Sequence, residues 1–207
     1  MKISLIGMSG SGKSYWSQKL KSLGFKVFCC DDLIAQKLGV KGVADVSKWM
    51  GQPYENRYQE THKQYLSFET GAMEHIFNEV GKLDGNVVID TTGSVIHLNP
   101  QILKSLRKLT KVIYLETPDS VKEQMFQIYM TDPKPVIWGD IFIRQKDESN
   151  FEALRNCYPR LLNYRSKKYQ KIADINIVYT LTRKGDFDAV DFLKLLTHAT
   201  PALSSRA

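Results

Sequence analysis

The sequence predicts an open, doubly wound α/β domain with three layers, α/β/α, around a five-stranded parallel sheet. Three observations support this fold class. Short apolar runs of the kind found in buried parallel strands alternate with longer helical patterns along the chain. The length of 207 residues suits one such domain. The composition, with 43% hydrophobic and 25% charged residues, is typical of a folded globular protein.

Each predicted strand is a short run of mainly β-branched, aliphatic or aromatic residues. The segments between the strands have the length and spacing of helices. A helical pattern over residues 43–80 is broken by Gly51-Gln52-Pro53, which predicts a short helix followed by a long one. The predicted strands comprise residues 2–6, 25–29, 86–90, 111–116 and 175–179, and the remaining predicted helices comprise residues 13–23, 31–38, 100–109, 118–130, 151–172 and 187–198.

One segment does not fit this alternation of strands and helices. Residues 131–150 contain Pro133, Pro135 and Gly139 among many polar residues, and such a length is unusual for a connection in a compact domain. Because long loops are often functional, we predict a mobile lid over this segment. Residues 1–199 would form a single domain and residues 200–207 a loose C-terminal tail.

The charge and hydropathy patterns restrict the class of partner. The chain has 29 Lys and Arg residues against 22 Asp and Glu residues, a net charge of +7. The basic residues are spread along the chain without a nucleic-acid motif, so we expect small anionic ligands and no nucleic acid. No run approaches the roughly 20 apolar residues of a membrane-spanning helix, and no signal-peptide pattern is present. We expect a cytoplasmic monomer without membrane partners.

The first predicted strand leads into a phosphate-binding motif. Residues 7–14 read Gly-Met-Ser-Gly-Ser-Gly-Lys-Ser and match the pattern G-x-x-x-x-G-K-[ST] in full. The glycines let main-chain amides turn towards phosphate oxygens, and the N-terminus of the following helix adds positive potential. Lys13 would contact the β- and γ-phosphates of ATP, and the Ser14 hydroxyl would ligate Mg²⁺. We assign nucleotide binding to Gly10, Ser11, Gly12, Lys13 and Ser14.

Asp90 ends a predicted apolar strand, the position of the metal-side aspartate in many P-loop proteins. We predict that Asp90 and Ser14 hold Mg²⁺ together; a turn or capping role for Asp90 is the alternative. The phosphate loop is shared by GTPases, ATPases and kinases. The sequence lacks the Asn-Lys-x-Asp motif with which GTPases read the base, so a kinase is favoured.

Three further motifs, in order after the phosphate loop, resemble the shikimate kinase family of P-loop kinases, and together they span nearly the whole chain. The segment Phe-Cys-Cys-Asp-Asp-Leu-Ile falls where the family has Asp-x-Asp before an isoleucine, and it aligns Asp31 with the second aspartate. A Gly-Gln-Pro-Tyr-Glu-Asn-Arg stretch resembles the family's Gly-Glu-x-x-Phe-Arg with one residue inserted and aligns Arg57. Near the end, an Arg-x-x-x-Tyr-x-x-x-Ala-Asp match aligns Arg165.

The resemblance implies an acceptor site. In the family, the aspartate aligned with Asp31 binds substrate hydroxyls beside the accepting oxygen, so Asp31 would be catalytic together with Lys13. The arginines aligned with Arg57 and Arg165 bind the substrate carboxylate, a task that suits a guanidinium fork. Gly93 aligns with the last of three glycines that approach the substrate ring. The structural alternatives are a helix N-cap for Asp31, an exposed side chain for Arg57 and a surface ion pair for Arg165.

The chain departs from the family pattern at three places. Cys29 stands where the family has its first aspartate. Thr91 and Thr92 replace two of the three glycines, which predicts a narrowed or reshaped wall of the acceptor site. Lys134 aligns with the lid arginine, and we expect it to contact the nucleotide phosphates as a point charge instead of a fork.

We therefore expect ATP- and Mg²⁺-dependent phosphorylation of a hydroxyl group on a small acidic metabolite, with shikimate as the first candidate acceptor. A kinase of the same fold that acts on another sugar acid, a nucleoside or a nucleotide is one alternative. A non-catalytic ATP-binding regulator is the other, and Cys29 with the Thr91-Thr92 pair favours it.

Overall fold

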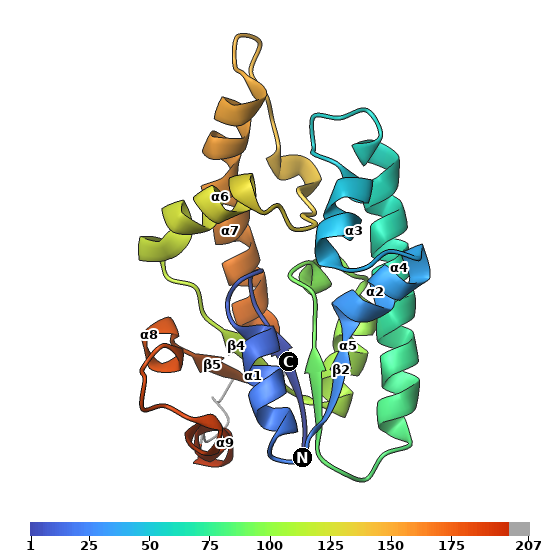
Figure 1. Cartoon of the computed structure of the whole chain (residues 1–207), viewed down its shortest axis with the longest axis vertical. Helices are drawn as coiled ribbons and strands as arrows, with labels where there is room; N and C mark the ends of the chain where they lie inside the picture. The colour runs from blue at the N-terminus through green and yellow to red at the C-terminus, as the bar shows by residue number, and fades with distance from the viewer. Residues whose placement is uncertain (199–207) are drawn as a thin grey trace.

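A five-stranded parallel sheet forms the centre of the molecule (Figure 1). The computed structural model describes residues 1–198. The strand order is β2-β3-β1-β4-β5, and each neighbouring pair is parallel. The predicted fold class is confirmed. The strands are β1 (Lys2–Ile6), β2 (Lys26–Cys29), β3 (Val87–Asp90), β4 (Lys111–Leu115) and β5 (Ile175–Ile177).

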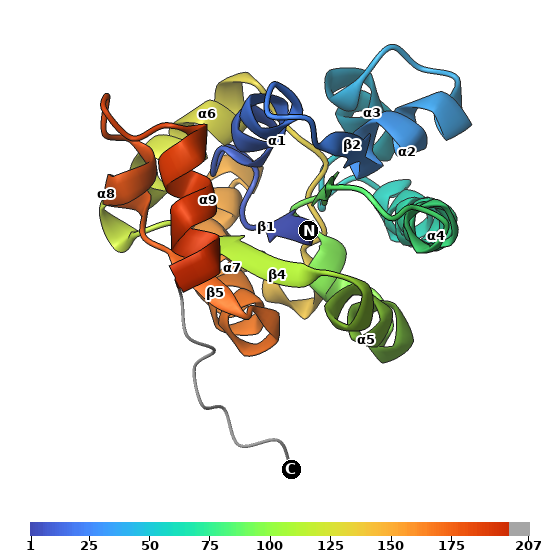
Figure 2. The ribbon, with the colours of Figure 1, turned by 90° about the horizontal axis from the view of Figure 1, so that it is seen from below.

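Helices cover both faces of this sheet (Figure 2). They are α1 (Lys13–Lys21), α2 (Cys30–Leu38), α3 (Val43–Met50), α4 (Tyr58–Gly81), α5 (Pro100–Leu109), α6 (Lys122–Thr131), α7 (Asn150–Ile172), α8 (Tyr179–Thr182) and α9 (Ala189–His198). Successive strand residues point to opposite faces. Leu5 therefore belongs to one buried cluster with Trp16 of α1 and Phe192 of α9, whereas Ile6 belongs to a second cluster with Ile102 of α5 and residues of α7.

Local signals fix where the helices begin and end. Helix α7 starts with a capping box, in which the Ser149 side chain accepts from the Glu152 amide and the Glu152 side chain accepts from the Ser149 amide. Helix α5 starts after Asn99, whose side chain accepts from the amide of Ile102 at 3.0 Å. Helix α2 ends at Gly39, which adopts a positive φ of 68°.

The register of the strands brings the predicted site residues to one edge of the sheet. Leu5 of β1 pairs with Asp90 at the end of β3, and Cys29 at the end of β2 pairs with the same aspartate. The phosphate loop begins directly after β1. In open parallel sheets, ligands bind outside the carboxyl ends of the strands, so this edge is where a site is expected.

The predicted lid is docked on the body of the protein over part of its length. The side chain of Trp138 is 1% exposed and packs against the rings of Tyr129, Phe142 and Tyr158. The Tyr58 hydroxyl donates to the carbonyl of Val136 at 2.8 Å and accepts from the amide of Trp138 at 2.9 Å. These contacts anchor the first part of the segment; motion of the remainder stays a prediction.

The element boundaries otherwise differ from those predicted only near the ends. The segment after β4 begins with a 3₁₀ turn at Asp119–Val121 before α6, and β5 ends at Ile177 because α8 follows it. The predicted C-terminal tail at residues 200–207 lies outside the described residues.

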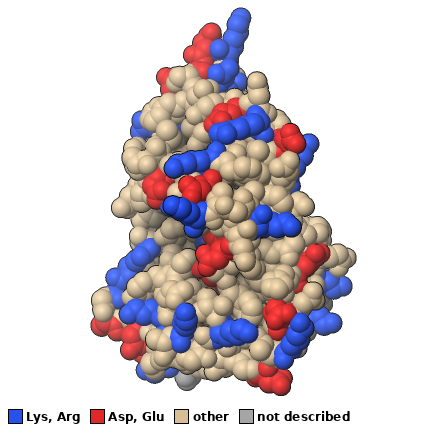
Figure 3. All heavy atoms as spheres, turned by 45° about the vertical axis from the view of Figure 1, so that its right-hand side comes forward, with Lys and Arg blue, Asp and Glu red and all other residues tan. Residues whose placement is uncertain are grey.

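Charges of both signs are interspersed over the face shown in Figure 3, which carries no large patch of a single sign. Within residues 1–198, each helix is too short or too polar to cross a membrane.

Candidate active site

The phosphate loop has the backbone shape that its sequence predicts. Gly10 and Gly12 have φ angles of 80° and 100°, values that side-chain-bearing residues rarely adopt. The amide of Ser11 donates to the carbonyl of Met8 at 3.1 Å and closes the turn. Helix α1 begins at Lys13, directly after the last loop glycine, so its free N-terminal amides face the loop. The arrangement is a concave set of main-chain donors at a helix N-terminus, which suits phosphate oxygens.

Lys13 is held across the inside of this loop. Its side chain is nearly buried, and Nζ donates to the carbonyls of Gly7 at 3.1 Å and Met8 at 3.0 Å. Burial lowers the pKa of Lys13, while the carboxylates of Asp90 and Asp31 oppose that shift. The amine is therefore bound to the loop carbonyls and attracted by two carboxylates, and a nucleotide phosphate would compete with them for it.

Asp90 and Ser14 lie on the same side of the phosphate loop. Burial raises the pKa of Asp90, and Lys13 together with the hydroxyls of Ser14 and Ser17 counteracts the shift. The Oδ1 atom of Asp90 is buried without a hydrogen-bond partner. An orphaned carboxylate oxygen beside a hydroxyl is a fitting donor set for Mg²⁺, which needs only one or two protein ligands when phosphates and water complete its shell. Residues 1–198 contain no cluster of three or more His, Cys, Asp and Glu side chains suited to a metal.

Asp31 lies in the first turn of α2, close to Lys13. Burial raises its pKa to about 6, and Lys13 is the largest opposing influence. Lys134 from the lid also acts on this carboxylate electrostatically. Cys29, in the place of the family's first aspartate, is a half-buried thiol whose pKa burial raises to about 12, so it is neutral near pH 7 and does not replace that carboxylate's charge.

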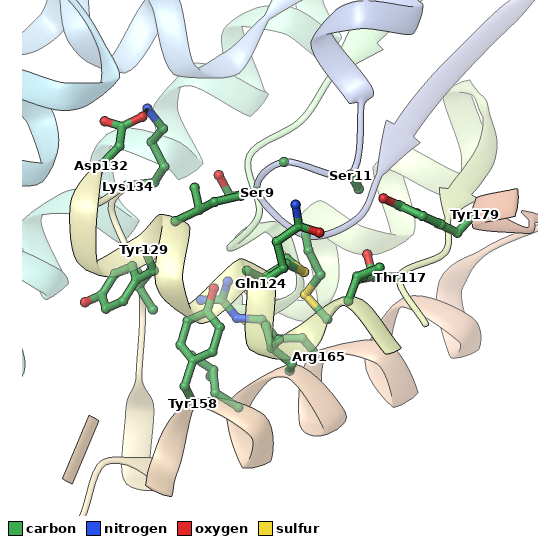
Figure 4. A pocket seen from close by; sticks show the side chains of 18 of the residues that line it. Ser9, Ser11, Thr117, Gln124, Tyr129, Asp132, Lys134, Tyr158, Arg165 and Tyr179 are labelled. Atoms are coloured by element: carbon green, nitrogen blue, oxygen red, sulfur yellow. Dashed lines mark hydrogen bonds and ion pairs between the residues drawn. The ribbon is translucent and has the colours of Figure 1, made fainter. Parts of the chain in front are cut away.

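A cavity of about 360 Å³ opens beside the phosphate loop (Figure 4). One wall is the loop itself, from Met8 to Ser11, and the others come from α6, the start of the lid, α7 and the segment after β5. Arg165 of α7 and Lys134 of the lid both line it. Asp31 is not among its lining residues.

Arg165 is the buried charge of this cavity. Its side chain is 3% exposed, Nη2 donates to the carbonyl of Ile137 at 2.9 Å, and Nε has no partner. Its charge helps to lower the pKa of Lys13. The surface ion pair considered as an alternative is therefore wrong for this residue, since no carboxylate of residues 1–198 forms an ion pair with its guanidinium. A buried guanidinium with an unused donor is suited to bind an anionic group.

The two threonines of the turn after β3 are bound inside the protein. Thr91 and Thr92 are fully buried and point into the protein, where Thr91 Oγ1 donates to the carbonyl of Leu5 at 2.8 Å and Thr92 Oγ1 donates to the carboxylate of Glu69. Neither side chain lines the cavity, and a reshaped acceptor wall stays a prediction. Gly93 does approach the site: a Cβ there would lie 3.2 Å from the Ser9 amide nitrogen and 3.6 Å from Arg165 Nη1.

The structure does not bring Arg57 to the cavity. Its side chain is 54% exposed, and Nε binds the Glu55 carboxylate at 2.8 Å. Lys134 does line the cavity but forms an ion pair with Asp132 at 2.6 Å. Of the charged residues that the sequence singled out, Lys13, Asp31, Asp90 and Arg165 therefore gather around the phosphate loop in this state, with Lys134 at the cavity's rim.

Three contributors to the site were not predicted from the sequence. Arg183 donates from Nη2 to the carbonyl of Gly10 at 3.2 Å, its guanidinium lies 5.1 Å from the ring centroid of Tyr179, and both residues line the cavity. Their position directly after the last strand of a parallel sheet was a usable signal. Glu69, which holds the turn after β3 through Thr92 and Ser94, gave no such signal, because it lies within a long amphipathic helix.

The chain was compared with family models, curated proteins and solved structures, and only solved structures match it. No family model matches the sequence, and no curated protein matches it significantly. Among solved structures, it resembles the shikimate kinase of Acinetobacter baumannii in complex with shikimate, with 22% identity, 95% of this chain and 90% of that chain covered, and a TM-score of 0.62. It also resembles the shikimate kinase of Aquifex aeolicus, with 18% identity, 95% of this chain and 96% of that chain covered, and a TM-score of 0.61. For the shikimate kinase of Bacteroides thetaiotaomicron, the identity is 14%, the coverage 95% of this chain and 98% of that chain, and the TM-score 0.64. At such identities the likeness establishes the architecture: this chain has the P-loop kinase fold of the shikimate kinases.

Proposed function

We propose that the protein transfers the γ-phosphoryl group of ATP to a hydroxyl group on a small anionic metabolite. One observation carries the proposal: a complete phosphate loop, with Lys13 buried across it, opens directly on a cavity that contains the buried guanidinium of Arg165. The loop supplies the site for the donor, and the arginine supplies an anchor for an anionic acceptor. Positioning and electrostatic stabilisation account for most of the rate in phosphoryl transfer.

The reaction needs few chemical groups from the protein. The bond between the γ-phosphorus and the bridging oxygen to ADP breaks, and a bond forms between that phosphorus and the acceptor oxygen. Lys13 and the loop amides stabilise negative charge on the transferring group. Mg²⁺, held by Ser14 and Asp90, would neutralise charge on the β- and γ-phosphate oxygens. The hydroxyl proton leaves to a base, and Asp31 fits this role because it is a carboxylate next to Lys13 with a pKa of about 6.

Arg165 is the primary acceptor anchor in this proposal. Arg57 would have to leave Glu55 to contribute, so its role as the second anchor remains an expectation. Shikimate is the first acceptor to test, since one of the similar structures is described as a complex with that compound.

An assay of ADP release tests the proposal. The protein would be incubated with ATP and Mg²⁺, with and without millimolar shikimate and a panel of other small hydroxylated acids. We expect at least one acid to stimulate ADP release and to gain a phosphate ester visible by ³¹P NMR. Binding of ATP without stimulation by any acid would contradict the proposal and favour the non-catalytic regulator.

A further inference from the structure

The chemistry of the cavity wall points to a narrower class of acceptor. Resting on the proposed function, we infer that the acceptor has one anionic group on a largely apolar, ring-like body, and is not a polyhydroxylated acid.

Two helices and the lid give the cavity an apolar lining. Met125 and Ile128 project from α6, Leu161 and Leu162 from α7, and Val136 from the lid. These side chains offer no hydrogen bonds, so a polyol placed against them would lose its bonds to water without replacement. An apolar body in the same place would instead gain from the removal of its surface and theirs from water.

Aromatic rings extend this lining. Tyr129 of α6 and Tyr158 of α7 stack with ring centroids 5.3 Å apart and an angle of 22° between the ring planes. Both rings line the cavity, as Figure 4 shows. The hydroxyl of Tyr129 is already committed to Gln52. The pair therefore offers ring edges and the Tyr158 hydroxyl to a flat ligand.

The unpaired polar atoms of the cavity fall into two groups, one suited to the nucleotide and one suited to an anionic acceptor. Among residues 1–198, the buried side-chain atoms without a partner include Ser11 Oγ, Thr117 Oγ1 and Arg165 Nε, and all three residues line this cavity. Ser11 belongs to the phosphate loop, and Thr117 follows β4 at the same edge of the sheet, so they suit the nucleotide. Arg165 Nε remains for a second anion. Because Lys134 is paired with Asp132, Arg165 is the cation at that end with an unused donor, within the part of the chain that the structure describes.

Several polar groups of the turn after β3 face away from the cavity. The hydroxyls of Thr91 and Thr92 are bound inside the protein, and the carbonyl of Gly93 accepts from the Tyr169 hydroxyl. Arg57 is paired outside the cavity. Gln124 and the Tyr158 hydroxyl do line the cavity, but beyond these two the α6 and α7 walls offer few partners to several hydroxyl groups on one ligand.

Isothermal titration of the protein loaded with ADP and Mg²⁺ tests the inference with two carboxylates of similar size. The probes are 3-(hydroxymethyl)benzoate, with an apolar ring and one hydroxyl, and shikimate, with three hydroxyls. We expect the benzoate to bind at least about tenfold more tightly, because its ring buries more apolar surface.

Two isoleucines provide a matched pair of variants. Ile128 lines the cavity and is 51% exposed, whereas Ile143 is 49% exposed and does not line it. Ile128→Asn should weaken benzoate binding about five- to tenfold and leave ADP affinity unchanged, and Ile143→Asn should alter neither. Arg165→Lys keeps the positive charge but loses the two-pronged guanidinium, so it should weaken the binding of both carboxylates.

Tighter binding of shikimate than of the benzoate would overturn the inference. So would a loss of ADP affinity in Ile128→Asn, since the apolar wall would then hold the nucleotide base, and so would a failure of both acids to bind. If the benzoate binds as expected but receives no phosphate from ATP, the inference about the cavity stands and the proposed phosphoryl transfer fails.

Discussion

At the scale of single residues, Lys13 is the side chain on which catalysis should depend most. Lys13→Ala removes the charge that would contact the β- and γ-phosphates, and we expect kcat to fall by about 10²-fold or more. Lys21→Ala, an exposed lysine on the same helix, is the control and should retain normal activity. Steady-state ADP release measures both, and circular dichroism checks the fold. Normal turnover in Lys13→Ala would refute the assignment of the loop.

Asp31 should control the acidic limb of the pH profile. Its pKa of about 6 lies above the usual value, and only the ionised carboxylate can accept the hydroxyl proton. We therefore expect kcat/KM to fall as the pH drops through about 6. Asp31→Asn should lose this limb and most of the activity.

The variant Asp32→Asn tests whether the acidic limb belongs to Asp31. The charge of Asp32 helps to raise the pKa of Asp31, so its removal should move the limb to lower pH and preserve it. A limb that persists unchanged in Asp31→Asn would show that another group is the base.

Single residues were predictable where the motif alone determines their position. The phosphate loop folds as predicted because its glycines and helix N-terminus act locally. The hydrogen bond of Thr92 was not predictable because its partner Glu69 lies 23 residues away in the chain. Arg57 was expected at the acceptor, but in the structure it binds the carboxylate of Glu55, two residues away. The motif that aligned Arg57 does not predict which anionic group this arginine binds.

At the scale of elements, Tyr58 should hold the lid segment in place. Tyr58→Phe removes both hydrogen bonds to the lid backbone and leaves the Val136 carbonyl and Trp138 amide without these partners. We expect a loss of about 1–3 kcal/mol in the free energy of unfolding and faster amide exchange at Trp138. Tyr54→Phe, a 40% exposed control, should change stability by less than about 0.5 kcal/mol. Unchanged exchange at Trp138 in Tyr58→Phe would exclude this anchoring role.

Strands and long helices were predictable, whereas the docking of the lid was not. Hydrophobic runs and caps are local signals, and they located the five strands to within two residues or so at each end. The lid depends on contacts across the chain, such as that of Tyr58 with Trp138, 80 residues apart. Helix α8 has only four residues and carries no periodic pattern.

At the scale of the whole molecule, buried carboxylates should make stability depend on pH. Burial raises the pKa of Glu69 to about 7, above its usual 4.5. Between these values the native state binds more protons than the unfolded state, so the free energy of unfolding falls as the pH rises. The contribution of Glu69 is roughly 3 kcal/mol at most.

Urea denaturation at several pH values measures this effect. Glu69→Gln should lose less stability than the wild type between about pH 4.5 and 7. The difference between the two proteins isolates Glu69 from Asp31 and from His97, whose pKa burial lowers to about 3. Glu74→Gln, an exposed glutamate on the same helix, should keep the wild-type slope. Equal slopes in wild type and Glu69→Gln would mean that Glu69 is not protonated in the folded protein.

The arrangement of the whole molecule gives the account its central claim, that the nucleotide and an anionic acceptor meet between the phosphate loop and Arg165. A crystal structure with Mg²⁺ and a non-hydrolysable ATP analogue tests this claim most directly. We predict β- and γ-phosphates in the amides of residues 10–14 and against Lys13 Nζ, with the γ-phosphate facing the cavity that Arg165 lines. A γ-phosphate directed away from that cavity, or a nucleotide bound elsewhere, would contradict it.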